Sequence, residues 1–211
     1  VLFETNNFFI MNILVTGGAG YIGSHVILNL LDSGYQVTVI DNLSVGYKRL
    51  IPDKVEFVKA NINDTNKLNQ LFKKKSFEAL FHFAGFIKVE ESIKYPEKYF
   101  INNTKNAAIL FENCINNGLK NIIFSSSAAV YGNPNKELIK EETDLNPLTP
   151  YGESKVQAEN QLIQMQKKNQ INYIIFRYFN VAGADPKLRS GLVSKNPTHL
   201  IKIASEAVVG K

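Results

Sequence analysis

The chain has 211 residues, of which 45% are hydrophobic, and its formal net charge is +5 at pH 7. This length and composition allow one buried core, so we expect one domain with at most a small appendage. The lysines are scattered and the arginines are few, which argues against a nucleic-acid partner. No apolar run reaches the roughly 20 residues that span a bilayer, and we find no secretory signal and no metal site, so we expect a cytoplasmic protein without a membrane partner.

Apolar, β-branched runs alternate along the chain with helical patterns. The runs predict strands at residues 12–16, 36–40, 55–58, 78–83, 121–126 and 172–179. The patterns between and after them predict helices at residues 21–33, 64–75, 95–117, 151–169 and 197–209. Strand alternating with helix, without a repeated sequence period, is typical of a parallel sheet covered on both faces. We therefore expect a doubly wound α/β domain.

Two segments carry more specific expectations. In the first helix the spacing places Ile22, Val26, Leu30 and Ser33 near one face, and Gly34 ends the helix. The longest irregular stretch, residues 132–150, contains three prolines. We expect it to be a surface loop near the carboxyl edge of the sheet.

The first strand runs into a glycine-rich turn, TGGAGYIG. Gly18, Gly20 and Gly23 fit the pattern G-x-G-x-x-G, and Gly17 begins an overlapping G-x-x-G-x-x-G. Such glycines let the backbone approach a pyrophosphate whose charge faces a helix N-terminus. The next strand ends in Asp41, whose carboxylate can bind an adenosine ribose and would repel a 2′-phosphate. The sequence thus predicts a dinucleotide site that favours NAD over NADP.

Two later stretches suggest a reaction. The strand NIIFSSS ends in Ser127, and YGESK follows at residues 151–155. In a helix Tyr151 and Lys155 stand one turn apart on the same face. An ammonium beside a phenol, together with a positive nicotinamide ring, stabilises the phenolate and brings the phenol pKa from about 10 towards 7. Tyr151 then serves as a general base and Ser127 binds the substrate oxygen, which predicts oxidation of an alcohol by NAD.

Several motifs together resemble the UDP-glucose 4-epimerases, an extended family of the short-chain dehydrogenase/reductase superfamily. They are TGGAGYIGSH, DNLS, HFAG, SSSAAVYG, PYGESK and RYFN, and the resemblance runs from Met11 to the end of the chain. It implies a Rossmann-type NAD-binding domain with the start of a substrate-binding region at residues 11–211. It also implies that the C-terminal substrate domain is largely missing and that residues 1–10 are an extra segment, disordered or artefactual.

The resemblance further implies a reaction and the residues that serve it. UDP-galactose and UDP-glucose would be interconverted by transient oxidation at C4, with NAD retained. Ser127, Tyr151 and Lys155 would be catalytic. The cofactor would contact Gly17, Gly20, Tyr21, Ile22, Gly23, Asp41, Asn42, Asn61, Ile62, Phe83, Ala84, Gly85, Asn102, Tyr151, Lys155 and Tyr178. The substrate would contact Ser127, Tyr151, Asn180, His199 and Leu200.

Some positions depart from the family pattern or are expected to be structural. Asn61 stands where many members have an acidic residue for the adenine amino group, and Ile87 stands where a lysine is common. His82 and His25 are expected to pack rather than react.

Three interpretations remain open. The chain is an active UDP-hexose 4-epimerase, another nucleotide-sugar epimerase or dehydratase, or a catalytically impaired remnant that at most binds NAD. Against a dehydratase, Ala128 and Ala129 occupy the place of that group's Asp-Glu pair. Family analogy also favours a homodimer formed through the long helices at residues 95–117 and 151–169.

Overall fold

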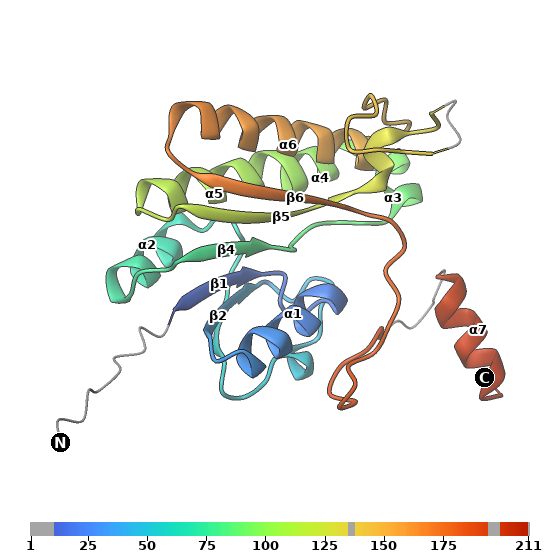
Figure 1. The fold of residues 1–211 in the computed structure, drawn as a ribbon, viewed down its shortest axis with the longest axis horizontal. Coiled ribbons are helices and arrows are strands. Elements are labelled where there is room, and N and C mark those ends of the chain that lie inside the picture. Colours follow the sequence, from blue (N-terminus) through green and yellow to red (C-terminus); the bar gives the residue numbers. More distant parts are fainter. Residues whose placement is uncertain (1–10, 135–137, 194–198, 211) are drawn as a thin grey trace, which may run out of the picture.

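The structure is a computed structural model that describes residues 11–134, 138–193 and 199–210. These residues form a six-stranded sheet in the order β3-β2-β1-β4-β5-β6, with every neighbouring pair parallel (Figure 1). The strands are β1 (Asn12–Thr16), β2 (Gln36–Asp41), β3 (Glu56–Lys59), β4 (Ala79–His82), β5 (Asn121–Ser127) and β6 (Asn172–Tyr178). The strand order reverses between β1 and β4, which confirms the doubly wound arrangement and places a topological switch point there.

Helices cover both faces of this sheet. They are α1 (Tyr21–Asp32), α2 (Thr65–Lys74), α3 (Val89–Lys94), α4 (Pro96–Tyr99), α5 (Asn106–Asn116), α6 (Pro150–Lys168) and α7 (Leu200–Val208). Two 3₁₀ turns, η1 (Lys48–Leu50) and η3 (Ala128–Tyr131), and a π-helical turn, η2 (Phe100–Lys105), complete the described elements. Figure 1 shows α5 and α6 on one face of the sheet and α1 on the other.

Alternate strand residues supply two separate cores. Leu14, Ile40 and Leu80 face the layer of α2, α5 and α6, where they pack with Leu110 and Leu162. The intervening strand residues face α1 and pack with its Ile27 and Leu30; they include Ile13, Val15, Val39 and Ala79. Because successive side chains of a strand point to opposite faces, burial on both faces requires the nearly continuous apolar runs that the sequence contains.

The predicted strands are each confirmed to within one residue at either end. The predicted face of α1 is wrong in part: Leu30 is buried, but the helix also buries Gly23, Ser24 and Ile27, and it leaves Ile22 and Val26 half-buried and Ser33 exposed. The glycines decide this orientation, since only a helix face without bulky side chains can approach the turn after β1 so closely.

The predicted helix at residues 95–117 is confirmed in extent, because α4, the π-helical η2 and α5 follow one another without a gap from Pro96 to Asn116. Its π-helical turn and the separate helix α3 before it were not predicted. The last predicted helix, at residues 197–209, begins at Leu200 in the structure, and its first two residues lie outside the described ranges. π-helical turns arise where an extra residue is inserted into a helix, and they often mark functional sites.

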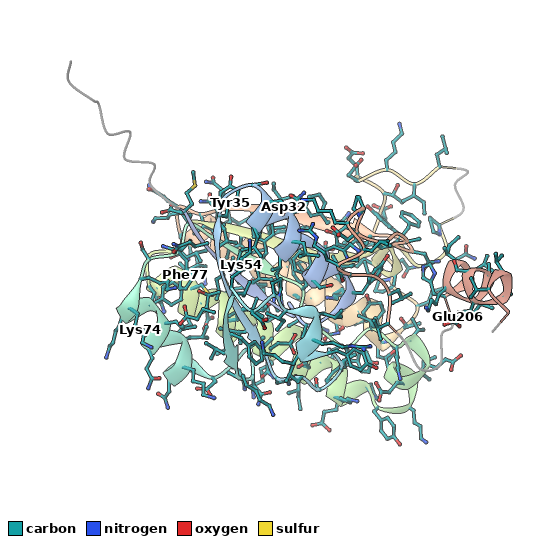
Figure 2. The ribbon with its side chains drawn as sticks, turned by 90° about the horizontal axis from the view of Figure 1, so that it is seen from below. Asp32, Tyr35, Lys54, Lys74, Phe77 and Glu206 are labelled. Atoms are coloured by element: carbon teal, nitrogen blue, oxygen red, sulfur yellow. The ribbon has the colours of Figure 1, made fainter. Side chains whose placement is uncertain are left out.

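The carboxyl-terminal elements leave apolar side chains exposed. On β6, Ile174 and Phe176 are 54% and 44% exposed. Helix α7 buries none of its residues. Figure 1 shows α7 beside the sheet and its helices, and Figure 2 places its Glu206 apart from Asp32 and Tyr35, which flank the end of α1. Among the described residues, no helix combines the length and apolar character needed to cross a bilayer.

Candidate active site

The glycine-rich turn joins β1 to α1 at the switch point of the sheet. Gly17 has a φ of +73°, and a Cβ added there would lie 2.4 Å from the backbone N of Ala84. A Cβ on Gly23 would lie 2.3 Å from the Gly17 carbonyl oxygen. Gly20 is the N-cap of α1 and offers no side chain to satisfy the first N–H groups of the helix. The first N–H groups of α1 thus have no side-chain cap, and the turn before them leaves no room for side chains. Such an arrangement is suited to binding the phosphates of a dinucleotide.

Asp41 lies at the end of β2, beside this turn. Its side chain is buried, and its two carboxylate oxygens accept hydrogen bonds from the backbone N–H of Ala19, at 3.0 Å, and of Leu43, at 2.8 Å. The adjacent Asn42 donates to Asn61 Oδ1 at 2.8 Å. An amide oxygen accepts two hydrogen bonds, so Asn61 Oδ1 can accept one more. Asp41 therefore holds the turn in shape as well as presenting its charge at the strand end.

Helix α6 positions the Tyr-Lys pair. Thr149 caps the helix by accepting a hydrogen bond from the Gly152 N–H at 3.2 Å, and Pro150 occupies the first turn. A Cβ on Gly152 would lie 2.6 Å from the Ala129 carbonyl oxygen. The glycine thus lets the start of α6 pack against η3, which follows β5. Tyr151 and Lys155 are both buried as a result.

Ser127 and Tyr151 interact at the end of β5. The Ser127 oxygen accepts a hydrogen bond from the Ala129 N–H at 3.2 Å, which leaves its own O–H to be donated. Burial raises the pKa of Tyr151, and the hydrogen bond from Ser127 lowers it in part. The chain's own groups therefore leave the pKa of Tyr151 raised, and the expected lowering, which includes the nicotinamide ring, stays a prediction. Lowering it requires the further positive charge that a nicotinamide ring carries when bound.

Lys155 reaches from α6 to the end of β5. Its Nζ donates to the Ser125 carbonyl oxygen at 2.8 Å and lies 5.0 Å from the centre of the Phe124 ring. Burial lowers the pKa of Lys155 to about 8, and the Glu159 carboxylate acts against that shift. A Cβ added to Gly85 would lie 3.4 Å from the Lys155 ammonium, so the segment after β4 and the Tyr-Lys helix meet here.

The sequence interpretation missed Asn103, which lies in the π-helical turn η2. Asn103 is buried; its Oδ1 accepts from the Phe86 N–H and its Nδ2 donates to the Phe86 carbonyl, each at 2.9 Å. It also donates to Ser154 Oγ at 3.2 Å, and so it fixes the segment after β4 against α6. Asn102, which the sequence predicts at the cofactor, is half-buried and donates to Asn103. The sequence feature that could have revealed Asn103 is a pair of adjacent asparagines inside a helical pattern, where asparagine is unfavourable.

Other predicted cofactor residues lie at the strand ends, at the start of α1 and in the core. Phe83, Ala84 and Tyr178 lie half-buried at the carboxyl ends of β4 and β6, on the same edge as the glycine turn, where Tyr178 is the register partner of Ser127. Tyr21 donates its hydroxyl to the Gly183 carbonyl at 2.6 Å. Ile62 is buried in the core, so only its main chain can meet a ligand.

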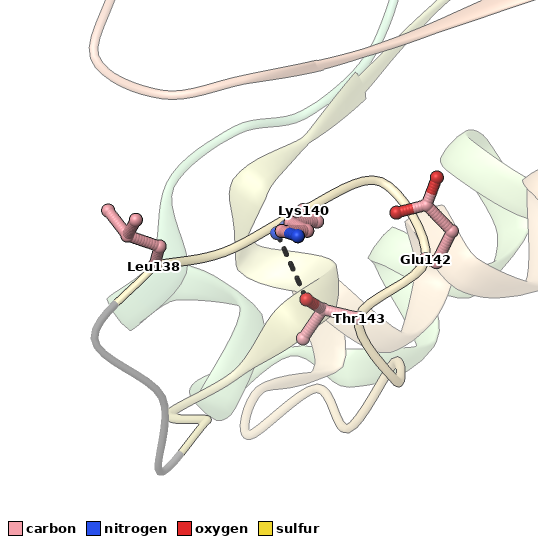
Figure 3. Close-up of a pocket in the computed structure, with 4 residues that line it drawn as sticks. All are labelled: Leu138, Lys140, Glu142 and Thr143. Atoms are coloured by element: carbon pink, nitrogen blue, oxygen red, sulfur yellow. Dashed lines mark hydrogen bonds between the residues drawn. The ribbon is translucent and has the colours of Figure 1, made fainter.

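The predicted substrate residues outside the strand edge are not brought together. Asn180 is exposed just after β6. His199 is the N-cap of α7, and Leu200 is 75% exposed. A separate shallow hollow, lined by Leu138, Lys140, Glu142 and Thr143, lies within the loop before α6; there the Lys140 N–H donates to Thr143 (Figure 3). None of the predicted site residues lines it.

His82 packs at the end of β4, as the sequence interpretation expects. Its Nδ1 is hydrogen-bonded to Thr16 Oγ1 at 2.6 Å, and its ring stacks on Phe124. Burial lowers the pKa of His82 to about 3, well below its usual range.

This buried histidine predicts acid sensitivity. Because the unfolded chain binds a proton on His82 near pH 6.5 and the folded chain does not, stability should fall as pH drops from about 6.5 towards 3, by at most about 1.4 kcal/mol per pH unit. Urea unfolding between pH 7 and 5 measures this slope, and the slope should be shallower in His82→Gln. Equal slopes for the two proteins would show that His82 is not responsible.

A doubly wound parallel sheet with a glycine turn at its switch point, and a Ser-Tyr-Lys set at the same edge, defines a nucleotide-dependent protein of the short-chain dehydrogenase/reductase class. Comparison with known proteins agrees. The sequence model of the NAD dependent epimerase/dehydratase family matches residues 13–209, and the chain belongs to this family.

Individual relatives are more specific. The chain is 43% identical over 199 residues to a UDP-glucose 4-epimerase of Azospirillum brasilense, covering 94% of this chain and 57% of that protein. It is 42% identical over 191 residues to a putative UDP-arabinose 4-epimerase of Arabidopsis thaliana, covering 86% of this chain and 46% of that protein. The resemblance to UDP-glucose 4-epimerases is thus confirmed.

Solved structures give the same result. A crystal structure of UDP-glucose 4-epimerase from Brucella ovis in complex with NAD superposes with a TM-score of 0.90 at 38% identity, covering 95% of this chain and 61% of that one. The chain spans about half to three fifths of the length of these relatives.

Proposed function

We propose that this chain is the cofactor-binding and catalytic part of an NAD-dependent epimerase that interconverts UDP-galactose and UDP-glucose at C4. The observation that carries this proposal is the meeting of Ser127, Tyr151 and Lys155 at the sheet edge that also holds the glycine turn. Support comes from membership of the epimerase/dehydratase family and from the relatives named UDP-glucose 4-epimerase.

The cofactor would lie along the carboxyl edge of the sheet. The turn of Gly17, Gly20 and Gly23 would hold the diphosphate, and Asp41 and Asn42 the adenosine ribose. Phe83, Ala84 and Gly85, which follow β4, would line the cofactor groove. Asn102 of η2 and Tyr178 at the end of β6 would lie at its nicotinamide half. When bound, NAD supplies a hydride acceptor and donor for C4 of the sugar.

Tyr151 would take the proton of the sugar 4-hydroxyl. It would return that proton after the 4-keto sugar has rotated to present its other face. Ser127, whose side chain lies beside the phenol of Tyr151, would hold the same oxygen by donating its O–H. Lys155 would stabilise the phenolate with its ammonium charge. Asn180, His199 and Leu200 would meet the UDP-sugar, and a homodimer formed through α5 and α6 is part of the proposal.

The direct experiment is to incubate the folded chain with UDP-galactose, with and without added NAD, and to quantify UDP-glucose by chromatography. UDP-glucose formation supports the proposal. UDP-arabinose and UDP-glucuronate are assayed in parallel, because some relatives are named UDP-arabinose 4-epimerase. Turnover of one of these sugars alone would identify another nucleotide-sugar epimerase. NAD binding without any turnover would identify a catalytically impaired remnant.

The position of Asp41 predicts cofactor choice. Isothermal titration should show that NAD binds at least about tenfold more tightly than NADP, because the buried carboxylate repels a 2′-phosphate. Asp41→Asn should narrow that ratio even though it also weakens the turn, whereas Asp53→Asn, at an exposed carboxylate, should leave it unchanged. An unaltered ratio in Asp41→Asn would exclude this carboxylate as the determinant.

A further inference from the structure

A buried ion pair lies directly behind the proposed catalytic residues. The Glu159 side chain is 1% exposed and that of Arg177 is 20% exposed. Arg177 Nη2 donates to Glu159 Oε2 at 2.8 Å, and its Nε lies 3.1 Å from Oε1. The Ser126 hydroxyl donates to the same carboxylate. Each oxygen of Glu159 is therefore hydrogen-bonded, which a carboxylate withdrawn from water requires.

The same arginine reaches two further segments. Its Nη1 donates to the Tyr131 hydroxyl and to the Glu141 carbonyl oxygen, each at 2.9 Å. Arg177 lies on β6, Tyr131 at the end of η3, and Glu141 in the loop before α6. One guanidinium thus joins β6, η3 and this loop to the middle of α6 through Glu159.

Glu159 stands one helical turn after Lys155 on α6, on the same face. Glu159 on the same helix and His82 on β4 are the titratable groups that interact with the Lys155 ammonium. Tyr151 stands one turn before Lys155 on α6, and Arg177 on β6 pairs with Glu159. His82 is neutral at neutral pH because burial lowers its pKa to about 3. Glu159 is the anion in this set, and its carboxylate acts against the lowering of the Lys155 pKa by burial.

We propose that Glu159 is a positioning residue, which acts through Lys155. Its carboxylate, held by Arg177 and Ser126, keeps the Lys155 side chain charged and seated on the Ser125 carbonyl at the end of β5. This role rests on the proposed function, in which the ammonium charge of Lys155 stabilises the Tyr151 phenolate. Nothing in it requires Glu159 to touch cofactor or substrate.

The test is to follow the Lys155 pKa by NMR in the full chain labelled with ¹³C at lysine Cε, assigned with Lys155→Met. In Glu159→Gln the Lys155 pKa should fall by about one pH unit or more. The attraction between the Glu159 carboxylate and the Lys155 ammonium is lost, and the positive charge of Arg177 is no longer compensated. Glu153→Gln is the matched control, since Glu153 lies on the same helix and pairs with Gln157. It should leave the Lys155 pKa unchanged.

A second variant separates charge from packing. Arg177→Gln also breaks the buried pair, but it leaves the Glu159 carboxylate in place, so the Lys155 pKa should rise. If Glu159→Gln fails to fold, this variant tests the proposal by itself. An unchanged Lys155 pKa in a folded Glu159→Gln chain, or a fall in Arg177→Gln, would overturn the proposal and leave Glu159 a structural residue.

The NMR measurement needs no turnover. Failure of the chain to convert UDP-galactose would contradict the proposed function while the Lys155 pKa still decides the role of Glu159. Where the chain is active, Glu159→Gln should lower kcat at least about tenfold and shift its pH profile, with KM for UDP-galactose altered less than about twofold.

Discussion

Replacing Tyr151 by phenylalanine is expected to lower the rate of UDP-galactose epimerisation about 1,000-fold while the chain stays folded. The change removes the phenol oxygen that Ser127 contacts and leaves the ring, which packs edge-on against Tyr99, in place. The loss of one buried hydrogen bond should cost only about 1 kcal/mol of stability. Initial rates with UDP-galactose, compared with NAD affinity from titration, measure the effect.

The matched control is Tyr173→Phe, which removes a hydroxyl from a half-buried tyrosine of β6 at the opposite end of the strand from the site. It should retain the wild-type rate. A Tyr151→Phe chain with more than a tenth of that rate would exclude the phenol as the proton acceptor. Unaltered NAD affinity in both variants would assign the lost rate to chemistry rather than to cofactor binding.

Replacing Gly17 by alanine should destabilise the fold by about 3–5 kcal/mol and abolish tight NAD binding. The new Cβ would lie 2.4 Å from Ala84 N and 2.6 Å from the Phe83 carbonyl carbon, both of them backbone atoms that cannot turn aside. The turn or the end of β4 must shift instead, and both belong to the proposed NAD site. Urea unfolding and NAD titration measure the two effects.

Gly34→Ala separates this clash from backbone strain. Gly34 has a φ of +86°, similar to that of Gly17, but a Cβ there meets no atom within 4 Å. It should therefore cost only the left-handed conformation, about 1–2 kcal/mol, and leave NAD affinity unchanged. Equal losses of stability in the two variants would show that the close approach of Gly17 to β4 is unimportant.

Some features of the site follow from local sequence alone. Gly17, Gly20 and Gly23 could be placed between a strand and a helix because the surrounding periodicity changes there. Thr149 and Pro150 mark the start of α6, which fixes Tyr151 and Lys155 one turn apart. The six strands were likewise predictable, because strands buried on both faces must be apolar along their length.

Other features depend on contacts between distant residues. The π-helical turn within the helix at residues 95–117 could not be predicted from the pattern; there Asn103 bonds the backbone of Phe86 and the side chain of Ser154, both distant in sequence. The upward shift of the Tyr151 pKa depends on burial, which helical spacing does not report. The partner of Glu159 is Arg177, on another element, and neither residue forms a motif.

The sequence by itself determined the doubly wound sheet, the glycine turn and the Ser-Tyr-Lys set, because periodicity, capping and glycine placement are local properties of the chain. Only the tertiary structure decided which face of α1 packs, how Asn103 fixes the segment after β4, and how Glu159 and Arg177 lie behind Lys155. The physical reason is that burial and ion pairing depend on which distant residues meet, and this is settled only when the helices have packed on the sheet.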